Sequence, residues 1–133
     1  MLLARLAQLL TRPRRRGGDH NLLGDRGEGV AAAMLRQKGY QIVARNWTCP
    51  LGEIDLICRD RDVVVYVEVK SGTSDQHDPE DHVNAAKRRQ IRRAAAAHRQ
   101  GMQPEPLVRF DIVAVVFRDD AEPIVRHHLD AFA

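Results

Sequence analysis

The chain has 133 residues, of which 44% are hydrophobic and 29% charged. That length fits one domain, and that composition supports a folded core rather than disorder. No apolar run approaches the roughly 18 residues typical of a membrane-spanning helix. The first ten residues are mostly apolar but contain Arg5 and precede a run of arginines, the reverse of the order in a secretory signal. Two cysteines, Cys49 and Cys58, lack partners at zinc-ligand spacing, so we expect a reducing, cytoplasmic location.

Positive charge is concentrated in two segments, although the net charge is only +3. Residues 1–16 contain arginines and no acid, and residues 82–104 contain Lys87 and further arginines, again with no acid. The rest of the chain is net acidic. A polyanion held beside carboxylates fits this pattern, and so does a solvated helix face with a frayed tail. Residues 1–20 are predicted to be a flexible basic extension and residues 21–133 a single domain.

The predicted elements follow the order α-β-β-β-α-β-β. Helical periodicity begins near Gly24 and stops at Lys38 and Gly39. Strands are predicted over residues 41–47, 53–59 and 63–70, then a polar loop over 71–81, a helix over 83–100, and strands over 107–117 and 123–129. The short link between the second and third strands requires antiparallel pairing. The fold class is therefore α/β or α+β with a mixed central sheet.

Two charged pairs fall on the second and third predicted strands. Glu53 and Asp55 share one face of their strand, and so do Glu68 and Lys70, because side chains alternate along a strand. A turn centred between residues 61 and 62 places Asp55 opposite Glu68 and Glu53 opposite Lys70. Directly opposed Cβ atoms lie about 4.5–5.5 Å apart.

The apolar residues on these strands fix that register, because a slip of one position would push charged side chains into the core. They alternate with the charged residues and are expected to share one core-facing surface: Ile54, Leu56, Cys58, Val63, Val65, Val67 and Val69.

Opposed carboxylates destabilise a sheet unless something compensates. Mg²⁺ or Mn²⁺ would do so, since hard divalent cations take carboxylate oxygens, water and substrate phosphate as ligands. Lys70 beside such a site is suited to hold a water or to stabilise charge during phosphoryl displacement. The alternative is a surface Glu–Lys ladder, with Asp55 in an ordinary salt bridge.

The combination of Asp55 with Glu68, Val69 and Lys70 on neighbouring strands resembles the PD-(D/E)xK nuclease superfamily, whose core order is α-β-β-β-α-β. More closely, the chain resembles the UPF0102 family (the YraN type), itself similar to archaeal Holliday-junction resolvases. The resemblance covers about residues 21–133. It rests on these segments together: Gly27-Glu28, Gly39-Tyr40, Arg45-Asn46-Trp47, Gly52-Glu53-Ile54-Asp55-Leu56-Ile57, Val67-Glu68-Val69-Lys70, Lys87-Arg88 and Arg109-Phe110-Asp111.

The resemblance implies a restriction-endonuclease-like fold and a set of site residues. Asp55 and Glu68 would bind Mg²⁺ or Mn²⁺ together with the backbone carbonyl of Val69. Lys70 would be the catalytic lysine, and Glu28 would assist directly or through water. Similarity to dimeric resolvases also suggests a homodimer.

Two positions depart from the pattern that the resemblance implies. Ile54 stands where a proline usually precedes the first strand acid, at a position that varies within the superfamily. Ser71 and Gly72 stand where the family pattern continues Thr-Arg, so the basic residue that would contact a backbone phosphate there is missing.

The predicted helix over residues 83–100 carries a row of cations that would bind phosphates in a salt-dependent, sequence-independent way: Lys87, Arg88, Arg89, Arg92 and Arg93. Lys87 is nearest the buried edge and could reach a phosphate close to the acids. His98, at an apolar position, is interpreted as a packed core histidine rather than a ligand.

Five further residues are interpreted as structural. His77 and His82 flank the acids of the polar loop, which is read as a solvated loop, with a transition-metal site as the alternative. Asp111 is interpreted as a structural acid paired with Arg109 or Arg45. His127 and His128 point to opposite faces of a strand and cannot chelate together.

The expected function is that of a metal-dependent endonuclease which hydrolyses DNA phosphodiesters, with branched structures among its candidate substrates. The alternative is a non-catalytic nucleic-acid-binding module that acts in DNA processing with a partner. RNA is a third candidate substrate, because no aromatic RNA-binding signature decides the matter.

Overall fold

The computed structural model describes residues 20–73 and 78–133. Its elements are α2 (His20–Gln37), β1 (Gln41–Cys49), β2 (Gly52–Asp60), β3 (Val63–Thr73), η1 (Pro79–His82), α3 (Ala85–Arg99), β4 (Leu107–Arg118) and β5 (Ala121–Phe132). The order predicted from the sequence is confirmed. The basic extension predicted over residues 1–20 lies outside the described residues except for His20, which begins α2. No helix of the described part of the chain is long and apolar enough to cross a membrane.

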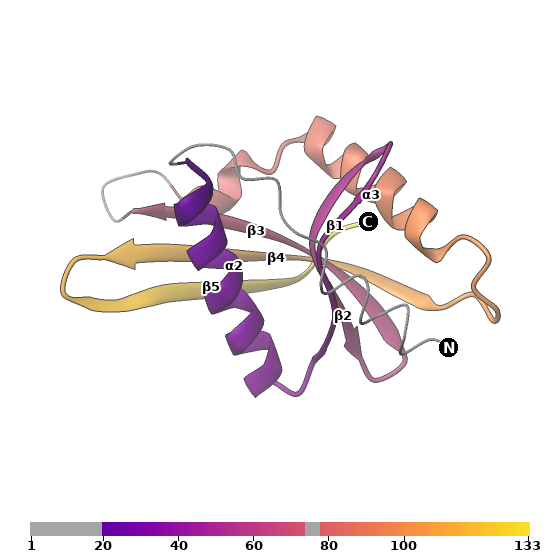
Figure 1. Cartoon of the computed structure of the whole chain (residues 1–133), viewed down its shortest axis with the longest axis horizontal. Coiled ribbons are helices and arrows are strands. Elements are labelled where there is room, and N and C mark those ends of the chain that lie inside the picture. Colours follow the sequence, from indigo (N-terminus) through magenta and orange to yellow (C-terminus); the bar gives the residue numbers. More distant parts are fainter. Residues whose placement is uncertain (1–19, 74–77) are drawn as a thin grey trace.

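A five-stranded sheet, in the order β1-β2-β3-β4-β5, forms the centre of the molecule. All neighbouring strands are antiparallel except β3 and β4, which are parallel and joined by the crossover through α3. α2 packs mainly on β3 and β4, whereas α3 packs mainly on β2 (Figure 1). This is an α/β, restriction-endonuclease-like fold, with a mixed sheet flanked by helices.

The predicted register of the β2–β3 hairpin is confirmed over the whole observed ladder. Leu56 pairs with Val67, and the pairing continues without a shift to Asp60 and Val63 at the turn. The ladder ends at Leu56, although both strands continue beyond it. β2 and β3 therefore part at Asp55 and Glu68, and the predicted pairings of Asp55 with Glu68 and of Glu53 with Lys70 are not part of the ladder.

Most of the predicted apolar face packs beneath α2, with one exception. Leu56, Cys58, Val65, Val67 and Val69 lie in one buried cluster with the apolar residues of α2. Ile54 was predicted to share that face, and this is wrong: it packs in the second cluster, beneath α3. β2 has left β3 by this point but stays paired with β1, so the strict alternation set by the β2–β3 ladder no longer applies.

The end of β3 and the segment after it differ from the prediction. β3 was predicted to end at Lys70 but continues to Thr73, because its parallel ladder with β4 runs on to the pair Thr73 and Phe117. The predicted loop over residues 71–81 also contains the 3₁₀-helix η1. Glu80 of η1 accepts two hydrogen bonds from Arg126 of β5, at 2.9 and 2.7 Å, which anchor this segment to the sheet.

Aromatic side chains fill the core between α3 and the sheet. Tyr66 stacks on Phe110, and Phe110 stacks on Phe132. His98 of α3 lies edge-on to Trp47 and Tyr66, and its Nδ1 is 2.9 Å from the Tyr66 hydroxyl. Burial lowers the pKa of His98, as expected for a packed neutral imidazole. The interpretation of His98 as a core residue is confirmed.

The buried acid of β4 is structural, as predicted, and its partner is Arg109. Asp111 is fully buried and accepts hydrogen bonds from Arg109, from the Nε2 of His127 at 2.7 Å and from the backbone N–H of Asp130. Burial alone would raise the pKa of Asp111, but the bonds from His127 and Arg109 outweigh it and hold the pKa at about 2. His128 points the other way, to Glu80, so the two histidines face opposite sides of β5.

Candidate functional site

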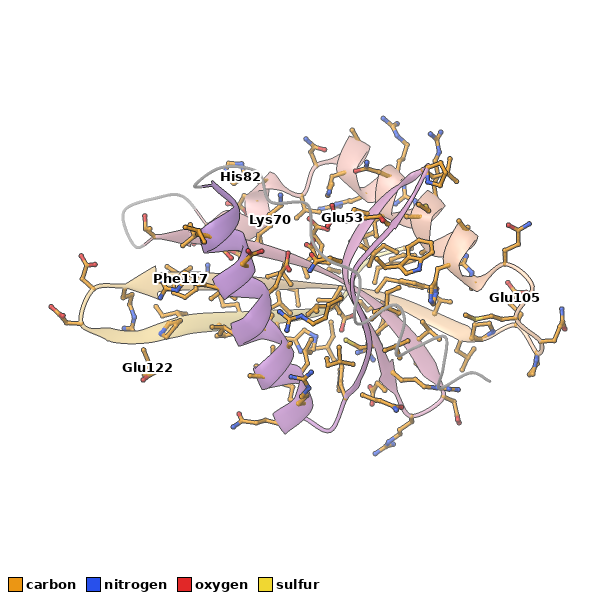
Figure 2. The ribbon with its side chains drawn as sticks, in the orientation of Figure 1. Glu53, Lys70, His82, Glu105, Phe117 and Glu122 are labelled. Carbon is orange, nitrogen blue, oxygen red and sulfur yellow. The ribbon has the colours of Figure 1, made fainter. Side chains whose placement is uncertain are left out.

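The predicted acids meet where β2 and β3 separate. The Oδ2 of Asp55 accepts a hydrogen bond from the backbone N–H of Val69 at 2.8 Å. The Asp55 side chain thereby bonds to β3 just past the end of the β2–β3 ladder. Glu68, the residue before Val69, is buried, with 4% of its surface exposed. Figure 2 shows the neighbouring Glu53 and Lys70 in the region between α2 and α3.

Two lysines approach the same oxygen of Glu68. The Nζ of Lys70 lies 3.9 Å from Glu68 Oε1, and the Nζ of Lys87 lies 3.7 Å from it. Lys87 is held in the first turn of α3 by the helix cap, because its backbone N–H bonds to the Asn84 side chain at 2.9 Å. Both lysine side chains are about one third exposed, so each can reach a ligand from solvent.

Burial and mutual repulsion both oppose ionisation of the two carboxylates. Burial raises the pKa of Glu68, and the adjacent Asp55 carboxylate raises it further, to about 8, against the opposing effect of Lys87 and Lys70. Burial also raises the pKa of Asp55, although its hydrogen bond from Val69 favours the charged form. Two acids that resist ionisation together form a site in which added positive charge is stabilised.

The chemistry of this donor set fits a hard divalent cation. Asp55 and Glu68 supply carboxylate oxygens, the ligands that Mg²⁺ and Mn²⁺ prefer, and a magnesium site commonly has only one or two of them. Within residues 20–73 and 78–133, no three His, Cys, Asp or Glu side chains form a cluster that could hold a metal ion. The fit therefore rests on two carboxylates, with water and substrate left to complete the coordination.

Glu28 is buried on α2, near the end of β3 that carries the acids. Its neighbour Gly27 packs so closely that a Cβ there would lie 1.7 Å from the Oγ of Ser71. Glu28 itself is 4% exposed. Within the described chain, Glu28 does not form a three-carboxylate cluster with Asp55 and Glu68. Of its two predicted roles, direct or through water, this arrangement fits the one through water. That role and the role of the Val69 carbonyl remain predictions.

The row of cations predicted along α3 divides into two groups. Arg88 and Arg92 are half-buried and donate to backbone carbonyls, of Val83 at 3.0 Å and Ala133 at 3.0 Å. Arg89 and Arg93 are exposed. Together with Lys87 they line a groove of about 530 Å³, whose remaining walls are Leu51, Ala86 and Gln90. Lys87 lines the groove and also contacts Glu68, so the groove places the exposed cations next to the carboxylates.

The residue that sequence reasoning did not single out is Leu51, in the β1–β2 turn. Its side chain is 53% exposed and forms one wall of the basic groove. The Pro-Leu-Gly sequence of residues 50–52 indicates a tight turn, but the sequence does not reveal that this turn rests on α3. A larger cavity of about 920 Å³, lined by Trp47 and His98 among others, lies at the opposite end of α3, and no predicted site residue is among its walls in the described chain.

The loop acids do not form a metal site in the described residues. Glu80 and Asp78 pair with Arg126, and Glu80 also bonds to His128 at 2.9 Å. Hydrogen bonds from Arg126 and His128 lower the pKa of Glu80 to about 2. His82 is exposed, and His77 lies outside the described residues. Glu80 therefore serves as an anchor between η1 and β5.

Fold and site together define a restriction-endonuclease-like domain with a pair of carboxylates, two lysines and an adjoining basic groove. Comparison with known proteins identifies its family. Residues 27–115 match the model of a family described as "Uncharacterised protein family UPF0102". The chain belongs to this family.

Curated relatives carry the same family name and match along most of their length. A UPF0102 protein of Anaeromyxobacter dehalogenans is 45% identical over 121 residues, which cover 87% of this chain and 90% of the relative. One from Geotalea uraniireducens is 40% identical over 86% and 91% of the two chains. One from Nocardia farcinica is 41% identical over 84% and 90%.

Proposed function

We propose that this protein is a metal-dependent endonuclease that hydrolyses phosphodiester bonds in DNA. The observation that carries the proposal is the pair of half-buried Asp55 and buried Glu68, with the ammonium groups of Lys70 and Lys87 both within 4 Å of one Glu68 oxygen. Like charges are costly to bury unless they serve a ligand, and the raised pKa of Glu68 reflects that cost.

Each side chain has a distinct role in this proposal. Asp55 and Glu68 hold Mg²⁺ or Mn²⁺, which when bound supplies Lewis-acid polarisation and neutralises charge on the phosphoryl oxygens. Lys70 holds the attacking water and orients it toward phosphorus. Lys87 binds a non-bridging phosphate oxygen, because it faces both the carboxylates and the basic groove. Glu28 acts through water from the α2 side.

The basic groove supports a nucleic-acid substrate rather than a small phosphoester. Arg89 and Arg93 are exposed beyond Lys87 and extend the positive surface away from the carboxylates along α3. A small phosphate ester would need only the site itself, whereas a polyanion uses the whole row. DNA is the substrate proposed, and RNA serves as a competitor in the test.

The test is cleavage of labelled linear duplex, single-stranded, flap and four-way-junction DNA with Mg²⁺, Mn²⁺ or EDTA. The wild-type chain is compared with Asp55→Asn and Lys70→Met, and with Glu122→Gln as a control, since Glu122 is exposed and far from the site (Figure 2). We expect metal-dependent cutting by the wild type and Glu122→Gln, and a loss of at least about 100-fold in the other two.

Two results would contradict the proposal. Cutting that survives in both Asp55→Asn and Lys70→Met would place the activity elsewhere. Salt-sensitive binding by all four proteins, with no cutting in either metal, would overturn the nuclease and leave the non-catalytic binding module.

A further inference from the structure

We infer that Leu51 is a wedge that enters nucleic acid at a disrupted base step, next to the phosphate bound by Lys87. The inference rests on the proposed function and specifies its substrate class: DNA with an unpaired or unstacked base beside the bound phosphate, such as a gap, flap or junction. Intact duplex would be the poorer ligand.

The first supporting observation is the surroundings of Leu51. Single exposed leucines are ordinary on protein surfaces. Leu51, however, shares a groove with three cations, Lys87, Arg89 and Arg93. The other large exposed hydrophobic side chains of the described chain, Leu22, Leu107, Ile124 and Leu129, do not line that groove. Phosphates held by the cations would place the bases of the same strand near an apolar side chain.

The second observation is that Leu51 lies in a tight turn that contacts α3. Cys49 pairs with Gly52, which closes the β1–β2 turn tightly around Leu51. Gly52 has φ of +153°, and a Cβ on it would lie 2.7 Å from the Cγ of Gln90. The turn therefore lies directly against the Gln90 side chain of α3. A side chain held this way can be pushed between bases without its loop folding back.

The third observation links the wedge to the cleavage site. Lys87 lines the groove with Leu51, and its Nζ is 3.7 Å from Glu68. A strand lying in the groove therefore has one phosphate at Lys87, beside the carboxylates, and a base step at Leu51. Apolar wedges of this kind unstack a base step at a cost of a few kcal/mol, and that cost is smallest where stacking is already broken. Selectivity for disrupted DNA follows from this difference.

The test measures binding in EDTA, so that cleavage does not interfere. The full-length wild type is compared with Leu51→Ser and with Leu107→Ser, a matched exposed leucine outside the groove. Ligands are an intact duplex and the same duplex with a one-nucleotide gap, with 2-aminopurine beside the gap to report unstacking. Thermal melts verify that each variant folds.

We expect Leu51→Ser to lose about tenfold in affinity for the gapped DNA, with a change of less than about twofold for intact duplex. The fluorescence rise of 2-aminopurine on binding would disappear in Leu51→Ser and persist in Leu107→Ser. Equal losses on both DNAs, or no loss on either, would overturn the wedge but not the proposed function, which the cleavage assay tests separately. A wild type that binds neither DNA would overturn both.

Discussion

Lys87 of α3 and Glu68 of β3 lie with Nζ and Oε1 3.7 Å apart, which joins the carboxylate pair to the groove. The contact crosses from a helix to a strand, so α3 must be docked before the site is complete. It also gives Lys87 two neighbours of opposite kinds, a buried acid on one side and exposed arginines on the other.

Replacing Lys87 by methionine should weaken binding to DNA by the same factor whatever the base sequence. One lost phosphate contact removes about 0.9 from the slope of log K against log salt. The measurement is a salt titration of duplex affinity in EDTA, with Arg59→Gln as the control because Arg59 is exposed on β2 outside the groove. An unchanged slope in Lys87→Met would mean that Lys87 does not bind phosphate.

Glu68→Gln should stabilise the metal-free protein increasingly as the pH rises. The pKa of Glu68 is raised from 4.5 to about 8, so between these values the folded state keeps a proton that the unfolded chain loses. Stability contributed by that proton is present below pH 4.5 and is lost as the pH rises through 8. Glutamine mimics the protonated acid at every pH.

Thermal melts of wild type and Glu68→Gln in EDTA, from pH 5 to pH 9, measure this effect. The Tm difference should be small at pH 5 and grow in favour of the variant toward pH 9. Glu53→Gln, an exposed neighbour, serves as control. Added Mg²⁺ should raise the Tm of the wild type more than that of Glu68→Gln. A difference that shrinks with rising pH would contradict the assigned shift.

Gly27 and Gly29 should respond in opposite ways to alanine, although both lie in α2. A Cβ at Gly27 would collide with the Oγ of Ser71, whereas one at Gly29 meets nothing within 4 Å. Gly29→Ala should stabilise by about 0.5–1 kcal/mol through helix propensity. Gly27→Ala should destabilise by about 1–3 kcal/mol through overpacking.

Urea denaturation gives both free energies, and Ser71→Ala provides a rescue. Removing the Ser71 Oγ relieves the closest contact and leaves the Ser71 Cβ at 3.0 Å, so the double variant should recover most of the loss. Equal effects at Gly27 and Gly29 would show that helix propensity alone governs both positions.

Asp111→Ala should cost about 3–5 kcal/mol, because it removes a fully buried carboxylate and leaves the half-buried guanidinium of Arg109 without its main partner. Asp60→Ala removes a more exposed partner of the same arginine, at 3.2 Å, and should cost less than about 1 kcal/mol. Urea denaturation compares the two variants. Similar losses would mean that the ion pair with Asp111 contributes no more than a surface pair.

The sequence predicted the hairpin of β2 and β3 well because its determinants are local. Alternation of apolar and charged residues and a two-residue turn were sufficient to place Leu56 opposite Val67. The same local logic named Arg109, two residues away on one strand, as one of two candidate partners of Asp111, and the structure selects it over Arg45. These interactions join residues close in sequence or opposite in a regular ladder.

Other features depend on contacts between distant segments, which a single sequence does not reveal. The anchoring of Glu80 by Arg126 is one, and the approach of Gly52 to Gln90 is another. Arg88 and Arg89 are adjacent in sequence, yet one bonds to a backbone carbonyl and the other faces solvent. Helical periodicity could separate the apolar face of α3 from the polar one. It could not tell which arginines of the polar face bond to the backbone and which face solvent.

The parallel pairing of β3 with β4 divides the sheet into two locally connected parts. β1, β2 and β3 form successive hairpins, and β4 and β5 form another. The two parts are joined only when β3 pairs with β4, beginning with Val63 opposite Leu107. Closing so long a loop is entropically slow. The carboxylate pair belongs wholly to the first part, so we expect its scaffold to form early in folding and the union with β4 to limit the rate.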